Sequence, residues 1–340
     1  MKPRQGWLAL ALVLASLLAA ASTWWLQAGR QAAPAAVEGR GCTLEPQPAS
    51  SAHPGMVWVP AGSFDIGDTV YPEELPRRRR HVDGFWMDRT EVTNDAFAAF
   101  VRATGYLTVA ERPVDSAKHP GLPPEMQQPG AVVFVMPPDV RGRADISQWW
   151  RYVPGADWRH PGGPATGIQG HGAFPVVAVT VEDAQAYARW KGQALPSEAQ
   201  WEWAARAARP APAPAHEQPR DANTWQGLFP VVNSGEDGYV GLAPVGCYAP
   251  NALGLHDMIG NVWELTADAW TPQHGDAPPP DQVPAGLRGG GAAQQVIKGG
   301  SFLCAPNYCM RYRAGAREPQ DRDLAASHLG FRTVLVAPGP

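Results

Sequence analysis

The chain has 340 residues, of which 44 % are hydrophobic and 18 % charged, which is the composition of a globular protein rather than a disordered one. The formal net charge of −4 is small, and no basic block is large enough to indicate nucleic-acid binding. Gly and Pro number 36 each, so we expect frequent turns, short helices and no wide regular sheet. The four arginines at 77–80 form the densest basic run, and we interpret them as a solvated loop.

The N-terminal segment, residues 1–27, is predicted to be a signal peptide or a membrane anchor. Two basic residues precede an apolar run at 7–26, which is the order found in secretory signals. Ala19 and Ala21 have the small-x-small spacing at which signal peptidase cuts. An uncut run of about 20 apolar residues is long enough to span a bilayer. In both cases the basic end stays in the cytoplasm, so we expect the remainder in the periplasm or on the outer face of the inner membrane.

The rest of the chain is predicted to be a linker followed by one domain. Residues 28–52 are rich in Ala and Pro and indicate the linker, and residues 53–337 indicate the domain. Short strands are expected at 56–60 and 85–88. Pro-, Ala- and Gly-rich stretches at 209–220 and 271–293 are interpreted as surface excursions. Loops this long inside a compact domain indicate a function or a bound ion.

Three helices are predicted from their capping residues. Thr93 is the N-cap of the first helix, and Gly105 ends it. The second begins at Thr180, with Asp183 in the place of the usual Glu of a capping box. The third begins at Ser197, with a Gln three residues later. Together with the short strands, these helices predict a single α+β domain that is rich in loops.

Two of the four cysteines, Cys304 and Cys309, lie five positions apart and are candidates for redox or metal chemistry. The neighbouring Arg311 and Arg313 favour the thiolate form, and a pair of thiolates is a soft site that selects Cu(I). Spacing alone favours a local disulfide in an oxidising compartment. A zinc site is disfavoured because no second Cys or His pair follows at finger spacing. Cys42 and Cys247 stand alone, and the sequence does not show whether they pair.

Three further segments are rich in side-chain oxygens and glycine. They lie at 222–227, 233–239 and 257–264. Amide and carboxylate oxygens suit a hard cation such as Ca²⁺, which takes six to eight oxygen ligands. A plain Asn/Asp/Gly turn is the alternative, and spacing alone favours it.

The order of several segments resembles that of the formylglycine-generating, sulfatase-modifying enzymes. These segments lie at 56–64, 104–108, 158–161, 195–202, 260–264, 299–301 and 329–332. The resemblance covers nearly all of 56–335. Cys304 with Cys309 is the discriminating feature, because the wider superfamily often lacks that pair.

The resemblance implies a formylglycine-generating-enzyme fold, which is C-type-lectin-like, and an oxidase activity in the domain. Such an enzyme uses Cu(I) and O₂ to convert the cysteine of a Cys-x-Pro-x-Arg motif in an unfolded sulfatase to formylglycine. Cys304 and Cys309 would be the copper ligands and the redox-active pair. Ser301 and Trp263 would line the oxygen and substrate pocket, with Arg317 as a further member. We expect a monomer that binds no nucleic acid.

The same resemblance implies two structural Ca²⁺ ions that pin the loops. One would be held by the side chains of Asn223 and Asp237 and by the backbone carbonyls of Thr224 and Tyr239. The other would be held by the side chains of Asp257 and Glu264 and by the backbone carbonyls of Gly260 and Val262.

The chain departs from the family between the two cysteines. Ala305 stands where the family usually has His, and Asn307 where it has Ser. We expect these changes to affect proton handling and substrate contacts rather than the thiol pair. Two alternatives stay open: an exported, non-catalytic binding module of the same fold with a Cys304–Cys309 disulfide, and a related oxidase that acts on another exported peptide.

Overall fold

The computed structural model describes Cys42, Leu44 and residues 53–114, 121–142, 145–206, 217–274 and 293–336. The predicted signal or anchor at 1–27 lies outside these residues, as do most of the linker and most of the two predicted excursions. No helix among the described residues has the length and apolar character needed to cross a membrane.

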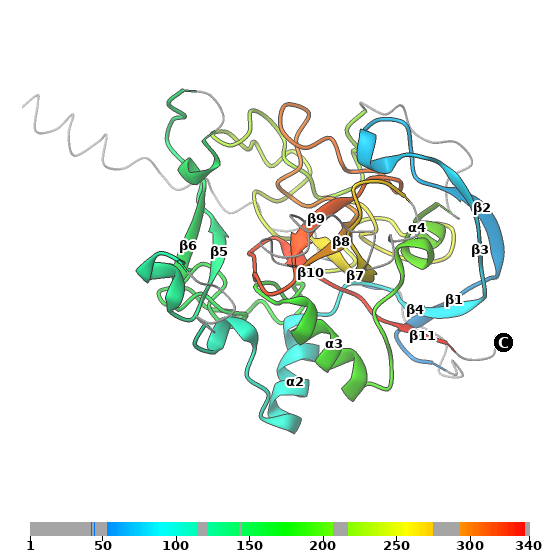
Figure 1. Ribbon diagram of the computed structural model, residues 1–340, viewed down its shortest axis with the longest axis horizontal. Helices are drawn as coiled ribbons and strands as arrows, with labels where there is room; N and C mark the ends of the chain where they lie inside the picture. Colours follow the sequence, from blue (N-terminus) through cyan, green and yellow to red (C-terminus); the bar gives the residue numbers. More distant parts are fainter. Residues whose placement is uncertain are drawn as a thin grey trace, which may run out of the picture. The chain divides into compact units, whose positions relative to one another are not determined.

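Short strands make up the sheets of the described domain, and none of the sheets is wide (Figure 1). A three-stranded sheet has the order β1-β4-β11, a four-stranded sheet has the order β10-β7-β8-β9, and β2-β3 and β5-β6 form two-stranded ribbons. The strands are β1 (Met56–Val59), β2 (Gly62–Ile66), β3 (Arg78–Val82), β4 (Phe85–Asp88), β5 (Gly130–Phe134), β6 (Trp150–Pro154), β7 (Trp263–Ala269), β8 (Gln294–Lys298), β9 (Glu318–Asp321), β10 (Leu329–Gly330) and β11 (Val334–Leu335). The strands predicted at 56–60 and 85–88 are confirmed as the antiparallel pair β1 and β4.

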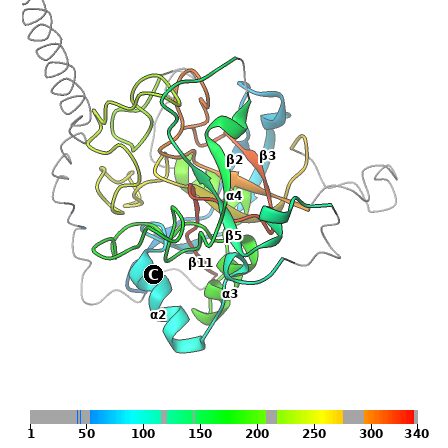
Figure 2. The ribbon, with the colours of Figure 1, turned by 90° about the vertical axis from the view of Figure 1, so that its left-hand side faces the viewer.

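The helices of the described residues are also short. The α-helices are α2 (Asn94–Thr104), α3 (Val181–Trp190) and α4 (Glu198–Arg206), and the 3₁₀ turns are Pro72–Glu74, Val109–Glu111, Pro124–Gln127 and Ile146–Gln148. α2 and α3 lie side by side at one end of the domain, as both views show (Figure 2). These short helices and strands, joined by loops, confirm the loop-rich α+β architecture expected from the sequence.

All three predicted capping arrangements are present. The Thr93 side chain accepts a hydrogen bond from the Ala96 N–H, and Gly105 ends α2 with a φ of 67°. Thr180 and Asp183 form the reciprocal capping box of α3. The N–H of Gln200 donates to the Ser197 hydroxyl, and the Ser197 N–H donates to the Gln200 side chain. These caps satisfy backbone groups that the first helical turn leaves without partners.

The arginine run at 77–80 is not a loop, so that prediction was wrong. Three of its residues belong to β3, which pairs antiparallel with β2 in a register that places Phe64 opposite Arg80. The β3 arginines are exposed, and Asp65 of β2 lies 3.8 Å from Arg79. The strand forms because β2, which lies earlier in the chain, pairs with it along its whole length. Ile66 lies opposite Arg78 at one end, and Gly62 lies opposite Val82 at the other. A basic composition does not reveal such a partner.

The central strands lead directly into the cysteine segment. β8 ends at Lys298, and Gly299 and Gly300 follow with φ values of 95° and 77°, which L-residues with side chains rarely adopt. A Cβ atom on Gly300 would lie 3.3 Å from the Cys304 Sγ and 3.1 Å from the Arg311 carbonyl oxygen. Glycine is therefore required for the chain to turn this closely beside the sulfur.

Candidate active site

The two clustered cysteines lie together at the end of this turn. The structure joins Cys304 and Cys309 in a disulfide, with their Cα atoms 4.6 Å apart. The backbone between them is a tight turn, in which the Cys309 N–H donates to the Ala305 carbonyl at 3.0 Å and the Cys304 N–H to the Ser301 carbonyl at 2.9 Å. Both cysteines are buried. When reduced, they would present two sulfur ligands at one point, which is a donor set that fits a single Cu(I) ion.

A cavity of about 320 Å³ opens beside the sulfur atoms. Trp150, Trp263 and Leu303 give it apolar walls, and Ser301 also lines it. The structure therefore brings two of the predicted pocket residues, Ser301 and Trp263, to the cysteine pair. The Ser301 hydroxyl already accepts a hydrogen bond from the Leu303 N–H at 3.3 Å, which orients it.

Arg317, the third predicted pocket residue, does not line this cavity. Its guanidinium is fully buried elsewhere, where its Nε lies 2.8 Å from a carboxylate oxygen of Glu198. It also donates to the carbonyl oxygens of Thr271, at 2.8 Å, and Glu73, at 3.1 Å. Arg317 thus ties two loops to the start of α4, and we do not include it in the proposed site.

Glu198 belongs to a buried charged cluster that the sequence did not reveal. Oxygen atoms of Glu198 and Glu202 and a ring nitrogen of His274 lie within 4.8 Å of one another. Such a group would suit a metal ion, but the Lys298 ammonium lies among them, 2.9 Å from Glu202 and 3.6 Å from Glu198. The protein itself therefore supplies the positive charge at this cluster.

We expect the charge on Glu198 to make the fold sensitive to acid. Burial raises the pKa of Glu198, but the His274 hydrogen bond and the charges of Lys298 and Arg317 outweigh it and lower the pKa from 4.5 to about 2. Because the folded-state pKa is lowered, the stabilisation is present above pH 4.5 and is lost as the pH falls toward 2. Urea unfolding between pH 5 and about 2 should show this loss for the native chain and less of it for Glu198→Gln. Equal pH slopes for the two proteins would contradict the assignment.

The cavity also contains a histidine that sequence reasoning missed. His328 lines the cavity, and its ring packs against Trp150 with 4.6 Å between the ring centroids. Its Nδ1 atom is buried and has no hydrogen-bond partner among the described residues. Burial lowers the pKa of His328 to about 4, so the imidazole is neutral at physiological pH. The signal was available, because His328 directly precedes the resembling segment at 329–332.

Arg311, which was expected to stabilise the thiolates, lies in the cavity wall with partners of its own. Its guanidinium lies 2.9 Å from the Glu318 carboxylate, contacts Glu73 and stacks 4.1 Å from the centre of the Tyr71 ring. The nearby carboxylates balance much of its charge, so its effect on the sulfur atoms is weaker than the sequence suggested.

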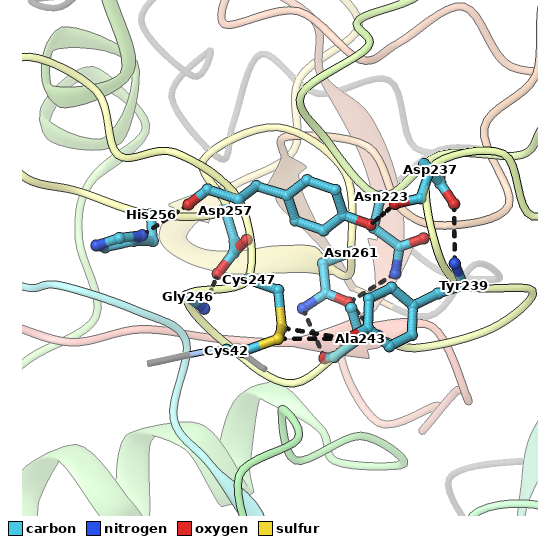
Figure 3. Close-up of a disulfide and its surroundings, with 11 residues drawn as sticks. Cys42, Asn223, Asp237, Tyr239, Ala243, Gly246, Cys247, His256, Asp257 and Asn261 are labelled. Carbon is cyan, nitrogen blue, oxygen red and sulfur yellow. Dashed lines mark hydrogen bonds between the residues drawn. A yellow bond between two sulfur atoms is a disulfide. The ribbon is translucent and has the colours of Figure 1, made fainter. Parts of the chain in front are cut away.

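The first predicted calcium site has donors that fit a hard cation. The Nδ2 of Asn223 donates to the Gly241 carbonyl at 2.9 Å and to Asn261 Oδ1 at 3.1 Å, which leaves Asn223 Oδ1 buried and without a partner in the described structure. The Asp237 carboxylate accepts hydrogen bonds from the backbone N–H groups of Thr224 and Tyr239, and Figure 3 draws the one from Tyr239. An unpaired buried amide oxygen on the same loops as a carboxylate is what a cation site requires.

The second predicted site fits less well. The Glu264 carboxylate accepts two hydrogen bonds of 2.7 Å from Arg332 and one of 2.9 Å from the indole of Trp201, so protein donors already satisfy it. Asp257 accepts the Gly246 N–H at 2.6 Å. Burial, with a contribution from the charge of Glu264, raises the pKa of Asp257 to about 6. We therefore derive nothing from a cation at this position.

A second disulfide lies beside these loops (Figure 3). Cys42 and Cys247, which are 205 positions apart, are bonded to each other. The Tyr239 hydroxyl lies 3.2 Å from the Cys42 sulfur and 3.4 Å from the Cys247 sulfur. The bridge fastens Cys42, in the predicted linker, to the loop that follows the first predicted calcium site.

The comparisons with known proteins decide the family. The family described as "Sulfatase-modifying factor enzyme 1-like domain" matches residues 42–337. The chain belongs to this family. The resemblance noted in the sequence and the loop-rich α+β fold are both confirmed.

Two relatives and one solved structure are similar to this chain. The chain is 48 % identical over 292 residues to the formylglycine-generating enzyme of Mycobacterium tuberculosis, which covers 82 % of this chain and 97 % of the relative. It is 34 % identical over 302 residues to a mouse protein named inactive C-alpha-formylglycine-generating enzyme 2, with coverage of 84 % and 87 %. The solved structure of PvdO from Pseudomonas aeruginosa has a TM-score of 0.54 at 24 % identity, with coverage of 82 % and 93 %, which is a likeness of fold alone. The chain is thus similar both to proteins named as formylglycine-generating enzymes and to one named as inactive.

Proposed function

We propose that this protein is a formylglycine-generating enzyme, which oxidises a cysteine of a sulfatase polypeptide to formylglycine. The observation that carries this proposal is the placement of the Cys304 and Cys309 sulfur atoms together at the wall of a cavity. The identity of 48 % to a protein named as this enzyme supports it.

We infer that the reduced pair holds one Cu(I) ion and that O₂ is the oxidant. The ion would supply the redox chemistry by which oxygen is activated. The apolar walls formed by Trp150, Trp263 and Leu303 exclude water from the sulfur atoms, and this strengthens every polar interaction inside the cavity. The Ser301 hydroxyl, which accepts the Leu303 N–H, would donate its own proton to a group bound in the cavity.

The client is a sulfatase that is still unfolded, with its cysteine in a Cys-x-Pro-x-Arg sequence. A cavity of about 320 Å³ has room for a side chain and its immediate neighbours but not for a folded partner. An unfolded segment is therefore the form of the client that suits this site. We further propose that the enzyme works as a monomer outside the cytoplasm, to which the signal peptide or anchor at 1–27 would export it. The Cys42–Cys247 bridge suits an oxidising compartment.

One structural Ca²⁺ ion is proposed at the first calcium site. Its ligands would be the side chains of Asn223 and Asp237 and the carbonyl groups of Thr224 and Tyr239. At about 100 times its dissociation constant such an ion stabilises the fold by about 2.7 kcal/mol. We expect chelation with EGTA to lower the Tm, and Asn223→Ala to remove the response to calcium.

Glu236→Gln is the matched control for the calcium test. Glu236 lies on the same loop, but its carboxylate is exposed and accepts a hydrogen bond from the Ser234 hydroxyl. This variant should keep the native shift of Tm with calcium. An equal response of the native chain and Asn223→Ala to calcium would contradict the site.

The alternative function is a non-catalytic module in which the Cys304–Cys309 disulfide is permanent. The disulfide in the structure and the relative named as inactive favour it. The two functions differ in one test, in which the reduced protein, Cu(I) and air are incubated with a Cys-x-Pro-x-Arg peptide and an aldehyde-reactive probe. Probe labelling of the peptide, but not of its Cys→Ala analogue, is expected for the enzyme. Labelling of neither peptide favours the module.

A further inference from the structure

The cavity beside the cysteine pair has a proton acceptor that the family resemblance does not assign to this chain. Besides the two cysteines, His328 is the lining residue whose side chain carries a nitrogen base when it is neutral. The segment between the cysteines offers no such group, since Ala305 is buried among aromatic residues and Asn307 does not ionise. A thiol entering the cavity therefore meets one imidazole.

The backbone holds His328 in place beside another wall residue of the cavity. It directly precedes β10, which pairs in parallel with β7, so that Leu329 lies opposite Trp263. The Trp263 N–H donates to the His328 carbonyl oxygen at 2.9 Å. The imidazole and Trp263 consequently face the same cavity from adjacent strands.

The side chain of His328 is held by packing and not by hydrogen bonds. Its ring lies against Trp150, and Nδ1 is buried without a partner in the described structure. A buried polar atom without a partner destabilises the fold, and in native proteins such atoms are rare and often functional. Because no described group bonds to Nδ1, hydrogen bonding does not fix which of the two nitrogens carries the proton.

Two other polar groups of the cavity have partners among the described residues. The Glu318 carboxylate lies 2.9 Å from the Arg311 guanidinium, and the Ser301 hydroxyl accepts the Leu303 N–H. Burial lowers the pKa of His328 to about 4, so the imidazole is neutral at physiological pH and is a weaker base than an exposed histidine. A neutral imidazole has a lone pair, which the protonated form lacks.

We propose that His328 is a further catalytic residue, which accepts the proton of the substrate cysteine thiol as that sulfur enters the cavity beside Cys304 and Cys309. The S–H bond breaks, an N–H bond forms on the imidazole, and the electron pair stays on sulfur, which becomes a thiolate. No oxidant or reductant is consumed in this step. The inference rests on the proposed function, since it names the proton acceptor of the same reaction.

The test compares His328→Gln and His328→Ala with the native enzyme in the peptide assay. General-base catalysis contributes about 10²- to 10⁴-fold at most, but a few per cent of a cysteine thiol is ionised unaided at neutral pH, so we expect kcat/KM to fall by about 10-fold in both variants. Added imidazole should restore part of the rate of His328→Ala and none of the rate of His328→Gln, because only alanine leaves space for it. Raising the pH toward the thiol pKa of about 8.5 should shrink the deficit, because the substrate then ionises unaided.

Two measurements separate this role from a structural one. Cu(I) binding, measured by competition with a chromophoric chelator, should be the same in the native and His328 variants. His81→Gln, which alters an exposed histidine on β3, should leave kcat/KM unchanged. Native rates in both His328 variants, or a loss of copper binding that matches the loss of rate, would overturn the inference while the proposed function stands. A native enzyme that converts no peptide would overturn both.

Discussion

Cys304→Ser and Cys309→Ser are each expected to lower peptide conversion by about 10³-fold or more. The two sulfur atoms lie at one point in the structure, and the proposed reaction needs both of them. Serine offers a hard oxygen with a proton that is difficult to remove, so a single replacement destroys the soft two-sulfur site. Groups that act as a unit are not additive, and the double variant should therefore be no slower than either single one.

The measurement is the initial rate of formylglycine formation, together with the amount of copper bound per chain. The reduced native protein is expected to bind equimolar Cu(I), and both single variants should lose it. The matched control is the double variant Cys42→Ser with Cys247→Ser, which removes the other disulfide and leaves the active pair intact. It should keep the native rate when the rate is expressed per folded molecule. A single active-site variant with more than about a tenth of the native rate would contradict the assignment of both sulfur atoms.

Arg332→Met is expected to lower the free energy of unfolding by about 3–5 kcal/mol, because it leaves buried carboxylates without their cation. Arg332 is completely buried and makes two hydrogen bonds of 2.7 Å to Glu264. Glu91 and Asp257 lie close enough for their charges to act on it. The pKa of Glu91 is already raised by its burial and by the charge of Asp257, so removing the guanidinium increases the repulsion.

Urea unfolding at neutral pH measures this effect. Adding Glu264→Gln to Arg332→Met removes one of the uncompensated charges, and we expect it to recover part of the lost stability. Arg79→Met is the matched control, since Arg79 is exposed on β3 and its replacement should change stability by less than about 0.5 kcal/mol. Equal destabilisation by Arg332→Met and Arg79→Met would show that the buried charge network is not what stabilises the C-terminal segment.

The features that the sequence predicted well depend on neighbours in the chain. The N-cap at Thr93, the αL glycine at 105 and the box of Thr180 with Asp183 each involve residues at most a few positions apart. Cys304 and Cys309 are close for the same reason, because a turn of five residues brings their sulfur atoms together. The family resemblance added Ser301 and Trp263, which the structure places at the same cavity.

The features that were missed depend on pairings between distant segments. The arginine run at 77–80 became a strand because β2 pairs with it, and Cys42 found a partner 205 positions away. Arg317 was assigned to the pocket from its position near the cysteine pair, but the Glu198 carboxylate, 119 positions away, draws it into a different cluster. His328 joins the cavity only because β10 pairs with β7.

The most direct test of the account is mass spectrometry of a Cys-x-Pro-x-Arg peptide after incubation with the reduced, Cu(I)-loaded protein in air. We predict a product in which the cysteine has lost its sulfur and gained one oxygen, as the conversion to formylglycine requires. The product should be absent without O₂ and absent with either active-site serine variant. An unchanged peptide in the presence of a protein that binds copper at Cys304 and Cys309 would contradict the account.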